Sequence, residues 1–254
     1  MRAIHDAAAV GFERGAAEYE RGRPGYPAEA VQTLVRALAI GPGVRVLDLA
    51  AGTGKLTREL VAGGADVVAV EPVDAMRATL AGALPGVEVL SGTAERLPLG
   101  PDSVEAVTAA QAFHWFDGDR ALAEIHRVLR GRGRLALVWN KRDESDPLQA
   151  RISEVIEPYR GRAPSHASLA WRAAFERTPL FGPLAEWHGS WVHTTDADGL
   201  VARAASISFI AALPPDKRDE VLARVRGLVA PAEPVRLAYR THVYWCERRP
   251  TSAA

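Results

Sequence analysis

The sequence predicts an α/β protein built on a doubly wound, mostly parallel sheet with helices on both faces. Between Val44 and Asn140, short apolar runs alternate with stretches of helical spacing, and a glycine-rich turn follows the first run. Near-continuous apolar strands suit a parallel sheet that is covered on both faces. The alternation of strand and helix is typical of the doubly wound architecture.

A helix is predicted ahead of the sheet. Four apolar residues there follow the spacing i, i+3, i+4 and i+7: Val31, Leu34, Val35 and Leu38. This spacing predicts a helix with one buried stripe. Pro24 and Pro27 exclude a long helix before it. Residues 1–42 as a whole are expected to form an N-terminal helical lid.

Five apolar runs predict the strands of the core. They are VRVLDLA from Val44, ADVVAVE from Ala65, VEVLSG from Val87, SVEAVTAA from Ser103 and RLALVWN from Arg134. Apolar spacing predicts two helix faces between them: Leu56, Leu60 and Val61 in the first, and Leu122, Ile125 and Leu129 in the second. Ligands of such sheets bind beyond the carboxyl ends of the strands, so the residues that follow each strand are the candidates for chemistry.

The chain beyond Asn140 predicts further helices and two late strands. The runs EWHGSWVHT from Glu186 and PVRLAYRTHVYWCE from Pro234 predict the strands, because apolar and polar residues alternate in the second run. Helical stretches are predicted over residues 141–175, 198–212 and 216–230. We expect residues 43–140 to form a ligand-binding core. Residues 141–254 would complete the same domain, with a helical insertion that covers the substrate.

Composition argues against several classes of partner. Lys plus Arg and Asp plus Glu number 31 each, whereas nucleic acids and anionic membranes require a clustered basic surface. Cys246 is the single cysteine, which excludes an intrachain disulfide and a cysteine-based metal cluster. No window approaches the roughly 20 apolar residues of a membrane span. We expect a cytoplasmic monomer or homodimer with no metal, nucleic-acid or membrane partner.

The glycine-rich turn in VRVLDLAAGTGKLT fits one of three known ligand loops best. A P-loop requires G-x-x-x-x-G-K-[ST], but here Leu49 replaces the first glycine and Leu56 replaces the hydroxyl. A dinucleotide loop requires a third glycine where Thr57 stands. In the third kind, an acid such as Asp48 precedes a bare loop, here residues 50–54, that lets backbone approach a ligand closely. The acid suits a ligand with a positive ammonium and no phosphate.

Asp48, Gly52 and Gly54 form a D-x-x-x-G-x-G pattern that resembles the first motif of class I S-adenosylmethionine-dependent methyltransferases. The resemblance extends from about Gly43 to Asn140. It implies a Rossmann-like, mostly parallel sheet of seven strands with one antiparallel late strand, and S-adenosyl-L-methionine as the cofactor. In this family the acid after the second strand, here Glu71, holds both ribose hydroxyls.

The resemblance also implies a set of cofactor-binding residues at the strand ends. Asp48 would contact the methionyl end, directly or through water. Met76 would lie near the adenine, Thr93 to Glu95 would flank it, and Gln111 would lie beside the methyl group. The complete core set is Asp48, Ala50, Ala51, Gly52, Thr53, Gly54, Glu71, Pro72, Met76, Thr93, Ala94, Glu95 and Gln111.

Two further segments narrow the resemblance. The pattern F-x-x-x-A-x-x-Y-x-x-x-R-P-x-Y-P begins at Phe12, and QAFHWFD begins at Gln111. Together they resemble the small-molecule branch of methyltransferase type 11, which includes trans-aconitate methyltransferase-like proteins. This resemblance implies that the N-terminal segment covers the cofactor and that Tyr19 and Arg23 contact the methionyl carboxylate. Packing of these aromatic residues on the sheet edge is the alternative.

The residues after the fourth and fifth strands are candidates for the acceptor site. His114 is the candidate catalytic base if the acceptor has a proton to lose, and a purely structural His114 is the alternative. A carboxylate acceptor needs no base, and Arg142 would hold it bidentately. Trp115 and Phe116 are expected to line the pocket.

The predicted function is methylation of a small-molecule acceptor, with O-methylation of a carboxylate or hydroxyl expected first. Two alternatives stay open. One is a non-catalytic scaffold or regulator that binds S-adenosylmethionine, and the other is a nicotinamide-dependent oxidoreductase.

Overall fold

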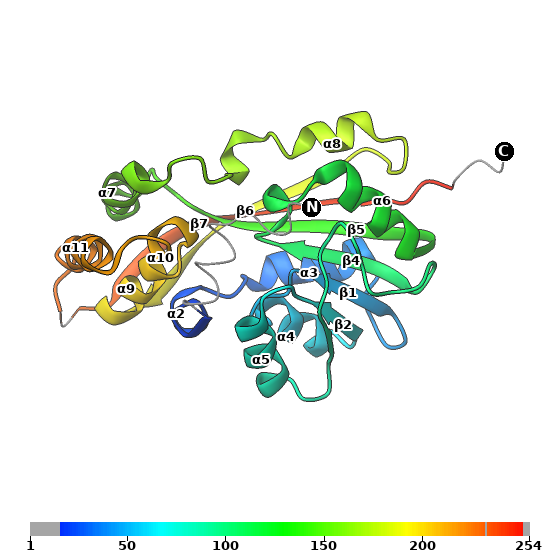
Figure 1. Ribbon diagram of the computed structural model, residues 1–254, viewed down its shortest axis with the longest axis horizontal. Helices are drawn as coiled ribbons and strands as arrows, with labels where there is room; N and C mark the ends of the chain where they lie inside the picture. The colour runs from blue at the N-terminus through cyan, green and yellow to red at the C-terminus, as the bar shows by residue number, and fades with distance from the viewer. Residues whose placement is uncertain (1–15, 232, 251–254) are drawn as a thin grey trace. The chain divides into compact units, whose positions relative to one another are not determined.

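The computed structural model of the protein describes residues 16–231 and 233–250, so Phe12 of the N-terminal pattern lies outside the described residues. These residues include a seven-stranded sheet of order β3-β2-β1-β4-β5-β7-β6 (Figure 1). The strands are β1 Arg45–Leu49, β2 Asp66–Val70, β3 Glu88–Leu90, β4 Val104–Ala110, β5 Leu129–Arg142, β6 Ala185–Thr195 and β7 Val235–Glu247. Each of the seven predicted runs overlaps one of these strands; β5 and β6 extend beyond their runs at both ends.

The sheet is mostly parallel. β1 pairs in parallel with β2 and β4, β2 pairs with β3, and β4 pairs with β5. β7 runs the other way, because the Arg248 N–H donates to the Gly133 carbonyl and the Asp143 N–H donates to the Ala238 carbonyl. The bridge between Phe181 and Arg248 is antiparallel as well. The predicted fold, with one antiparallel late strand, is confirmed, and the winding reverses between β1 and β4.

Several helices begin where the sequence supplies a cap or a proline. Asp117, Asp146 and Asp196 cap α6, α7 and α9, since each side chain accepts the N–H of the residue three positions on. The helices are α2 Ala16–Gly22, α3 Ala28–Leu38, α4 Lys55–Ala62, α5 Asp74–Ala83, α6 Gly118–Val128, α7 Pro147–Ile156, α8 Arg172–Arg177, α9 Ala197–Ala205, α10 Ser208–Ala211 and α11 Pro215–Arg226. Three short 3₁₀ helices are η1 Phe113–Trp115, η2 Glu157–Tyr159 and η3 His166–Ser168.

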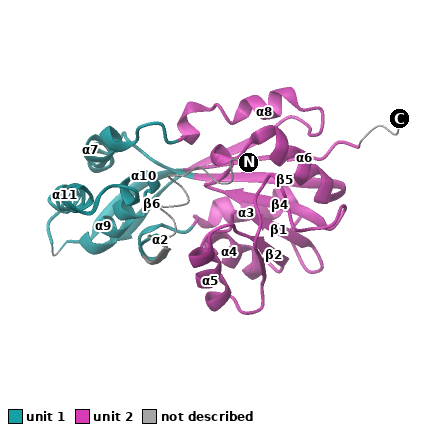
Figure 2. Ribbon diagram, in the orientation of Figure 1, with its two compact units in different colours: residues 1–25, 140–163, 190–240 teal, residues 26–139, 164–189, 241–254 magenta. Residues whose placement is uncertain are grey.

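The chain divides into two compact units (Figure 2). Unit 1 comprises residues 1–25, 140–163 and 190–240, and unit 2 comprises residues 26–139, 164–189 and 241–254. β5, β6 and β7 contribute residues to both units. The predicted roles of the N-terminal segment and of the helical insertion as covers of the site stay predictions.

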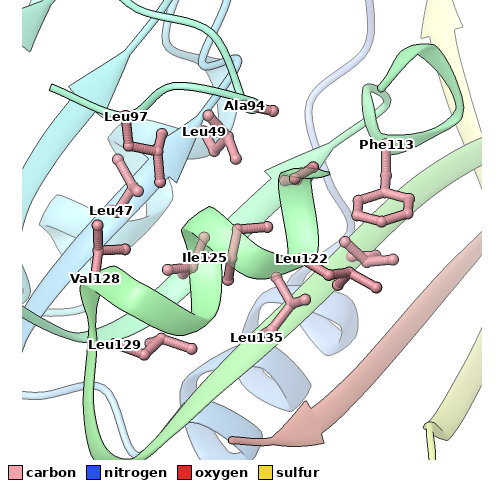
Figure 3. Close-up of a cluster of buried hydrophobic side chains, with 14 of the residues drawn as sticks. Leu47, Leu49, Ala94, Leu97, Phe113, Leu122, Ile125, Val128, Leu129 and Leu135 are labelled. Carbon is pink, nitrogen blue, oxygen red and sulfur yellow. The ribbon is translucent and has the colours of Figure 1, made fainter. Parts of the chain in front are cut away.

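Side chains on both faces of the sheet are buried in unit 2. On one face, Leu122 and Ile125 of α6 share a cluster with Leu47 of β1 and Leu135 of β5 (Figure 3). On the other face, residues of α3 and α4 pack with alternate strand residues: Leu34, Leu38, Leu56, Leu60, Val46, Ala106, Ala136 and Val138. Val61 was predicted on the buried face of α4 and is 39% exposed instead, because it lies about 100° around the helix from Leu60.

Unit 1 has a core of its own. It joins apolar residues of α7, α9, α11 and β7: Ile152, Val155, Ile156, Leu200, Ala204, Val221, Val225, Val235, Leu237 and Tyr239. α2 and α9 approach closely, since a Cβ atom on Gly22 would lie 2.2 Å from the Arg203 backbone nitrogen. Glycine at position 22 therefore fixes how α9 packs within this unit.

Candidate functional site

The loop after β1 has an unusual backbone. Ala50, Gly52 and Gly54 all have positive φ values, of 55°, 59° and 87°. The left-handed region suits glycine but strains an alanine, so the surrounding structure must hold Ala50 there. The Ala51 N–H donates to the Val70 carbonyl at 3.2 Å, which ties the loop to the end of β2. The result is a bare backbone turn that leads into α4.

Asp48 lies buried beneath this loop, with 1% of its surface exposed. Its carboxylate accepts hydrogen bonds from Thr57 Oγ1 at 2.7 Å and Thr108 Oγ1 at 2.9 Å. Burial raises the pKa of Asp48 from 3.8 to about 6, and the two hydroxyls oppose this rise. Thr108 and this role of Thr57 were not predicted from the sequence. The available signals were a polar residue inside the apolar β4 run and a threonine where a dinucleotide loop has glycine.

Glu71 follows β2 directly and joins two turns. Its Oε2 accepts the Gly52 N–H and its Oε1 accepts the Val73 N–H, both at 2.9 Å. Glu71 is 4% exposed, and burial raises the pKa of its carboxyl while the backbone N–H groups lower it. Arg77 donates to the carbonyls of Glu71 and Pro72. Glu71, which was predicted to hold the ribose hydroxyls, is thus hydrogen-bonded to the glycine-rich loop.

A second strained residue follows β4. Gln111 has a φ of 58°, and its N–H donates to the Val138 carbonyl at 2.7 Å. Ala50 and Gln111 therefore both adopt left-handed backbone conformations, directly after the two strands at which the winding reverses. Strained non-glycine residues concentrate at ligand sites. This is the position where a doubly wound sheet binds its ligand.

The residues predicted around the adenine follow β2 and β3 in the chain. Met76 on α5 and Ala94 are each 3% exposed. Thr93 forms a bridge with Arg96. Glu95 Oε1 accepts the Asp117 N–H at 3.0 Å, which links this segment to the start of α6.

His114 in η1 has a defined tautomer. The Trp139 indole N–H donates to His114 Nδ1 at 3.2 Å. An indole nitrogen only donates, so Nδ1 is the acceptor and the proton of the neutral imidazole is on Nε2. The Trp115 ring lies 5.3 Å from the imidazole. Phe116 packs edge-on against Phe113, at 5.5 Å between ring centroids, and lies against the core of unit 2.

Three predicted ligand residues belong to unit 1. The Arg23 guanidinium donates to Ser206 Oγ and to its carbonyl oxygen, both at 3.0 Å, and lies over the Tyr19 ring. Arg142 donates to Ser153 Oγ at 3.0 Å and to Glu157 Oε1 at 2.7 Å. The predicted contacts of Tyr19, Arg23 and Arg142 with cofactor or acceptor stay predictions.

Two further findings concern the described residues only. Over residues 16–231 and 233–250, no three His, Cys, Asp or Glu side chains come together as metal ligands. No helix in the same ranges is both long enough and apolar enough to cross a lipid bilayer.

Comparison with known proteins gives a consistent result. A family model described as a methyltransferase domain matches residues 47–137. An uncharacterized methyltransferase of Mycobacterium tuberculosis is 43% identical over 227 residues, which cover 87% of this chain and 86% of that protein. The YcgJ protein of Bacillus subtilis has a similar structure, with a TM-score of 0.58 at 20% identity over 89% of this chain and all of that one.

A second solved structure contains a cofactor product. The geranyl diphosphate C-methyltransferase of Streptomyces coelicolor was crystallised with S-adenosyl-L-homocysteine, and its fold matches with a TM-score of 0.51 at 13% identity. The match covers 87% of this chain and 76% of that one. Both the matching family model and the related protein are methyltransferases, which excludes the alternative of a nicotinamide-dependent oxidoreductase. The chain belongs to the class I S-adenosylmethionine-dependent methyltransferases, and its cofactor is S-adenosyl-L-methionine.

Proposed function

We propose that the enzyme transfers a methyl group to an oxygen atom of a small-molecule acceptor, a carboxylate or a hydroxyl. The observation that carries the proposal is the hydrogen bond from Trp139 to His114 Nδ1. It puts the imidazole proton on Nε2, in the segment that follows β4, and an acceptor oxygen can use such a donor. The equal numbers of acidic and basic residues support a small molecule rather than a nucleic acid.

The cofactor residues have complementary roles in this proposal. Glu71 accepts the ribose hydroxyls, since each carboxylate oxygen can accept a second hydrogen bond beside the backbone N–H that it already holds. Asp48 acts on the positively charged methionyl end through water. Met76 and the segment from Thr93 to Glu95 surround the adenine.

The chemistry favours a carboxylate acceptor. S-adenosyl-L-methionine supplies an electrophilic methyl group on a positively charged sulfur. The protein must align the acceptor and exclude water, and alignment contributes up to roughly 7–11 kcal/mol. A carboxylate is already anionic at neutral pH, whereas a hydroxyl has to lose a proton. His114 accepts that proton only if Nδ1 leaves Trp139, so a donor role for His114 agrees better with the observed hydrogen bond.

The proposal is tested with methyl-labelled S-adenosyl-L-methionine and paired acceptors. Small carboxylic acids are compared with their amides, and phenols with their methyl ethers, while mass spectrometry locates the added methyl group. Label on a carboxylate or phenol oxygen is the expected result. Transfer to nitrogen or carbon contradicts O-methylation. Binding of the cofactor without any methylated product supports the scaffold alternative.

Replacing His114 by alanine is expected to lower kcat/KM for a carboxylate acceptor by roughly 10- to 100-fold. A hydrogen bond to a charged oxygen contributes about 1.5–3 kcal/mol, which corresponds to that range. His114→Gln keeps an N–H donor but cannot act as a base, so most of the activity should return. His188→Ala, on β6, is the matched control. Equal losses in His114→Ala and His114→Gln, with a pH profile that disappears in both, would instead establish a base.

A further inference from the structure

Two arginines of unit 1 lie close enough for their charges to interact. Burial lowers the pKa of Arg142, and the positive charge of Arg203 is the next cause. Arg203 in α9 donates from Nε to the Tyr239 hydroxyl at 3.3 Å. The Tyr239 side chain, 1% exposed, also interacts electrostatically with Arg142. The Tyr239 hydroxyl is thus a hydrogen-bond partner of Arg203, and Arg142 lies within range of its charge.

Arg203 has a buried donor that nothing in the described chain satisfies. Its Nη1 is buried, and no described residue accepts a hydrogen bond from it. Arg142, in contrast, has Ser153 and Glu157 as partners. A guanidinium does not lose its proton in proteins, so deprotonation cannot relieve the buried N–H. An acceptor from outside the chain would satisfy it.

The charged residues around Arg142 and Arg203 allow an anion to bind. Glu157 accepts from both Arg142 and Arg160, so two arginines share one carboxylate. Glu144 is the other negative charge that acts on Arg142. Glu157 is therefore already shared between Arg142 and Arg160, and an anion from outside the chain would neutralise charge at Arg203.

Packing within unit 1 holds Arg203 and Tyr239, the two residues of the Nε hydrogen bond, in place. The backbone of Arg203 lies where α2 packs closely on α9, since a Cβ atom on Gly22 would meet it, and the hydrogen bond from Nε to Tyr239 orients the guanidinium. Tyr239 is stacked against Trp191, with ring centroids 5.6 Å apart at an angle of 29°. A guanidinium that is held rigidly loses little conformational entropy on binding, which favours a built ligand site.

We propose that Arg203, together with Arg142 and the Tyr239 hydroxyl, forms a binding site for the carboxylate of a small molecule. The planar fork of an arginine matches a carboxylate bidentately. The site lies within unit 1, and it rests on the proposed function only for the identity of the molecule.

The site is tested on the full-length protein with benzoate and with the neutral benzamide as probes. Thermal unfolding is followed against probe concentration at constant ionic strength, because a ligand of the folded state raises the melting temperature by an amount that grows with the logarithm of its concentration over Kd. Benzoate stabilises the wild type and benzamide does not. Arg203→Met weakens benzoate binding at least tenfold, whereas Arg151→Met, an exposed arginine of α7 in the same unit, leaves it unchanged.

A second set of measurements keeps the outcome clear. Arg203→Lys retains the charge without the planar fork and loses most of the benzoate affinity, even if Arg203→Met folds poorly. S-adenosyl-L-homocysteine affinity stays within twofold in all these variants. The site is overturned if benzamide or inorganic phosphate binds as tightly as benzoate, or if Arg203→Lys binds benzoate normally. Benzoate binding that depends on Arg203, together with methyl transfer to nitrogen or carbon in the acceptor assay, refutes the proposed function alone.

Discussion

Glu71→Ala is expected to weaken S-adenosyl-L-methionine binding by one to two decades and to destabilise the fold as well. The lost hydrogen bonds to the ribose are worth about 1.5–3 kcal/mol together, which corresponds to that loss of affinity. The N–H groups of Gly52 and Val73 also lose their acceptor. Each buried donor left unsatisfied costs about 1–3 kcal/mol, so the free energy of unfolding should fall by roughly 2–6 kcal/mol.

The two effects separate by experiment. Urea unfolding gives the free energy of unfolding, and calorimetric titration of the folded variant gives the cofactor affinity. Glu71→Gln keeps one acceptor oxygen and should lie between alanine and the wild type in both measurements. Glu88→Ala, a half-exposed acid on the adjacent strand β3, is the matched control, and its ion pair with Arg45 contributes about 0–1 kcal/mol. A folded Glu71→Ala protein with wild-type affinity would remove Glu71 from the cofactor site.

The sequence predicted the strands well because the sheet is buried on both faces. Apolar residues then run almost without interruption through β1, β2 and β4, and the polar residue that ends such a run is conspicuous. Asp48 and Glu71 were found in this way. Asp48 is the next-to-last residue of β1, and Glu71 directly follows β2. Val61 was wrongly predicted to be buried, because apolar spacing alone does not show which residue is the last on the buried face of a helix.

The partners of these acids could not be predicted, because they depend on distant pairings. Thr108 contacts Asp48 from 60 positions away, after β4 has paired with β1. The tautomer of His114 depends on Trp139, which is 25 positions along the chain. The Arg203–Tyr239 contact joins a helix and a strand that are 36 positions apart. The spacing of residue types along the chain cannot predict such contacts, because they depend on the register in which the strands pair.

Asp48 gives the stability of the free protein an unusual pH dependence. Its pKa is about 6 in the folded state, against an ordinary value of 3.8. Between these values the folded protein keeps a proton that the unfolded chain has lost, so the free energy of unfolding falls as the pH rises from about 4 to about 6. Above about pH 6 the ionised, buried carboxylate costs about 3 kcal/mol, because each pH unit of difference corresponds to 1.36 kcal/mol.

Asp48→Asn is therefore expected to stabilise the cofactor-free protein at pH 8 by up to about 3 kcal/mol. An asparagine can still accept from one of Thr57 and Thr108 and donate to the other, because a hydroxyl does both. At pH 4 the gain should vanish, since wild-type Asp48 is then protonated in the folded state. Urea unfolding from pH 4 to pH 8 measures this difference. Asp74→Asn, an exposed acid of α5, is the control and should change stability by less than about 0.5 kcal/mol.

The same substitution should weaken S-adenosyl-L-methionine binding, on the order of tenfold or about 1.4 kcal/mol. The cofactor has a positive sulfonium and a positive ammonium, which favour an ionised Asp48. Wild-type affinity should therefore rise with pH through about 6, whereas the affinity of Asp48→Asn should not follow that rise. A carboxylate that destabilises the empty site but attracts the ligand explains why the protein retains a buried charge at a cost in stability. An asparagine variant that keeps both the wild-type affinity and its pH dependence would show that Asp48 only supports the loop.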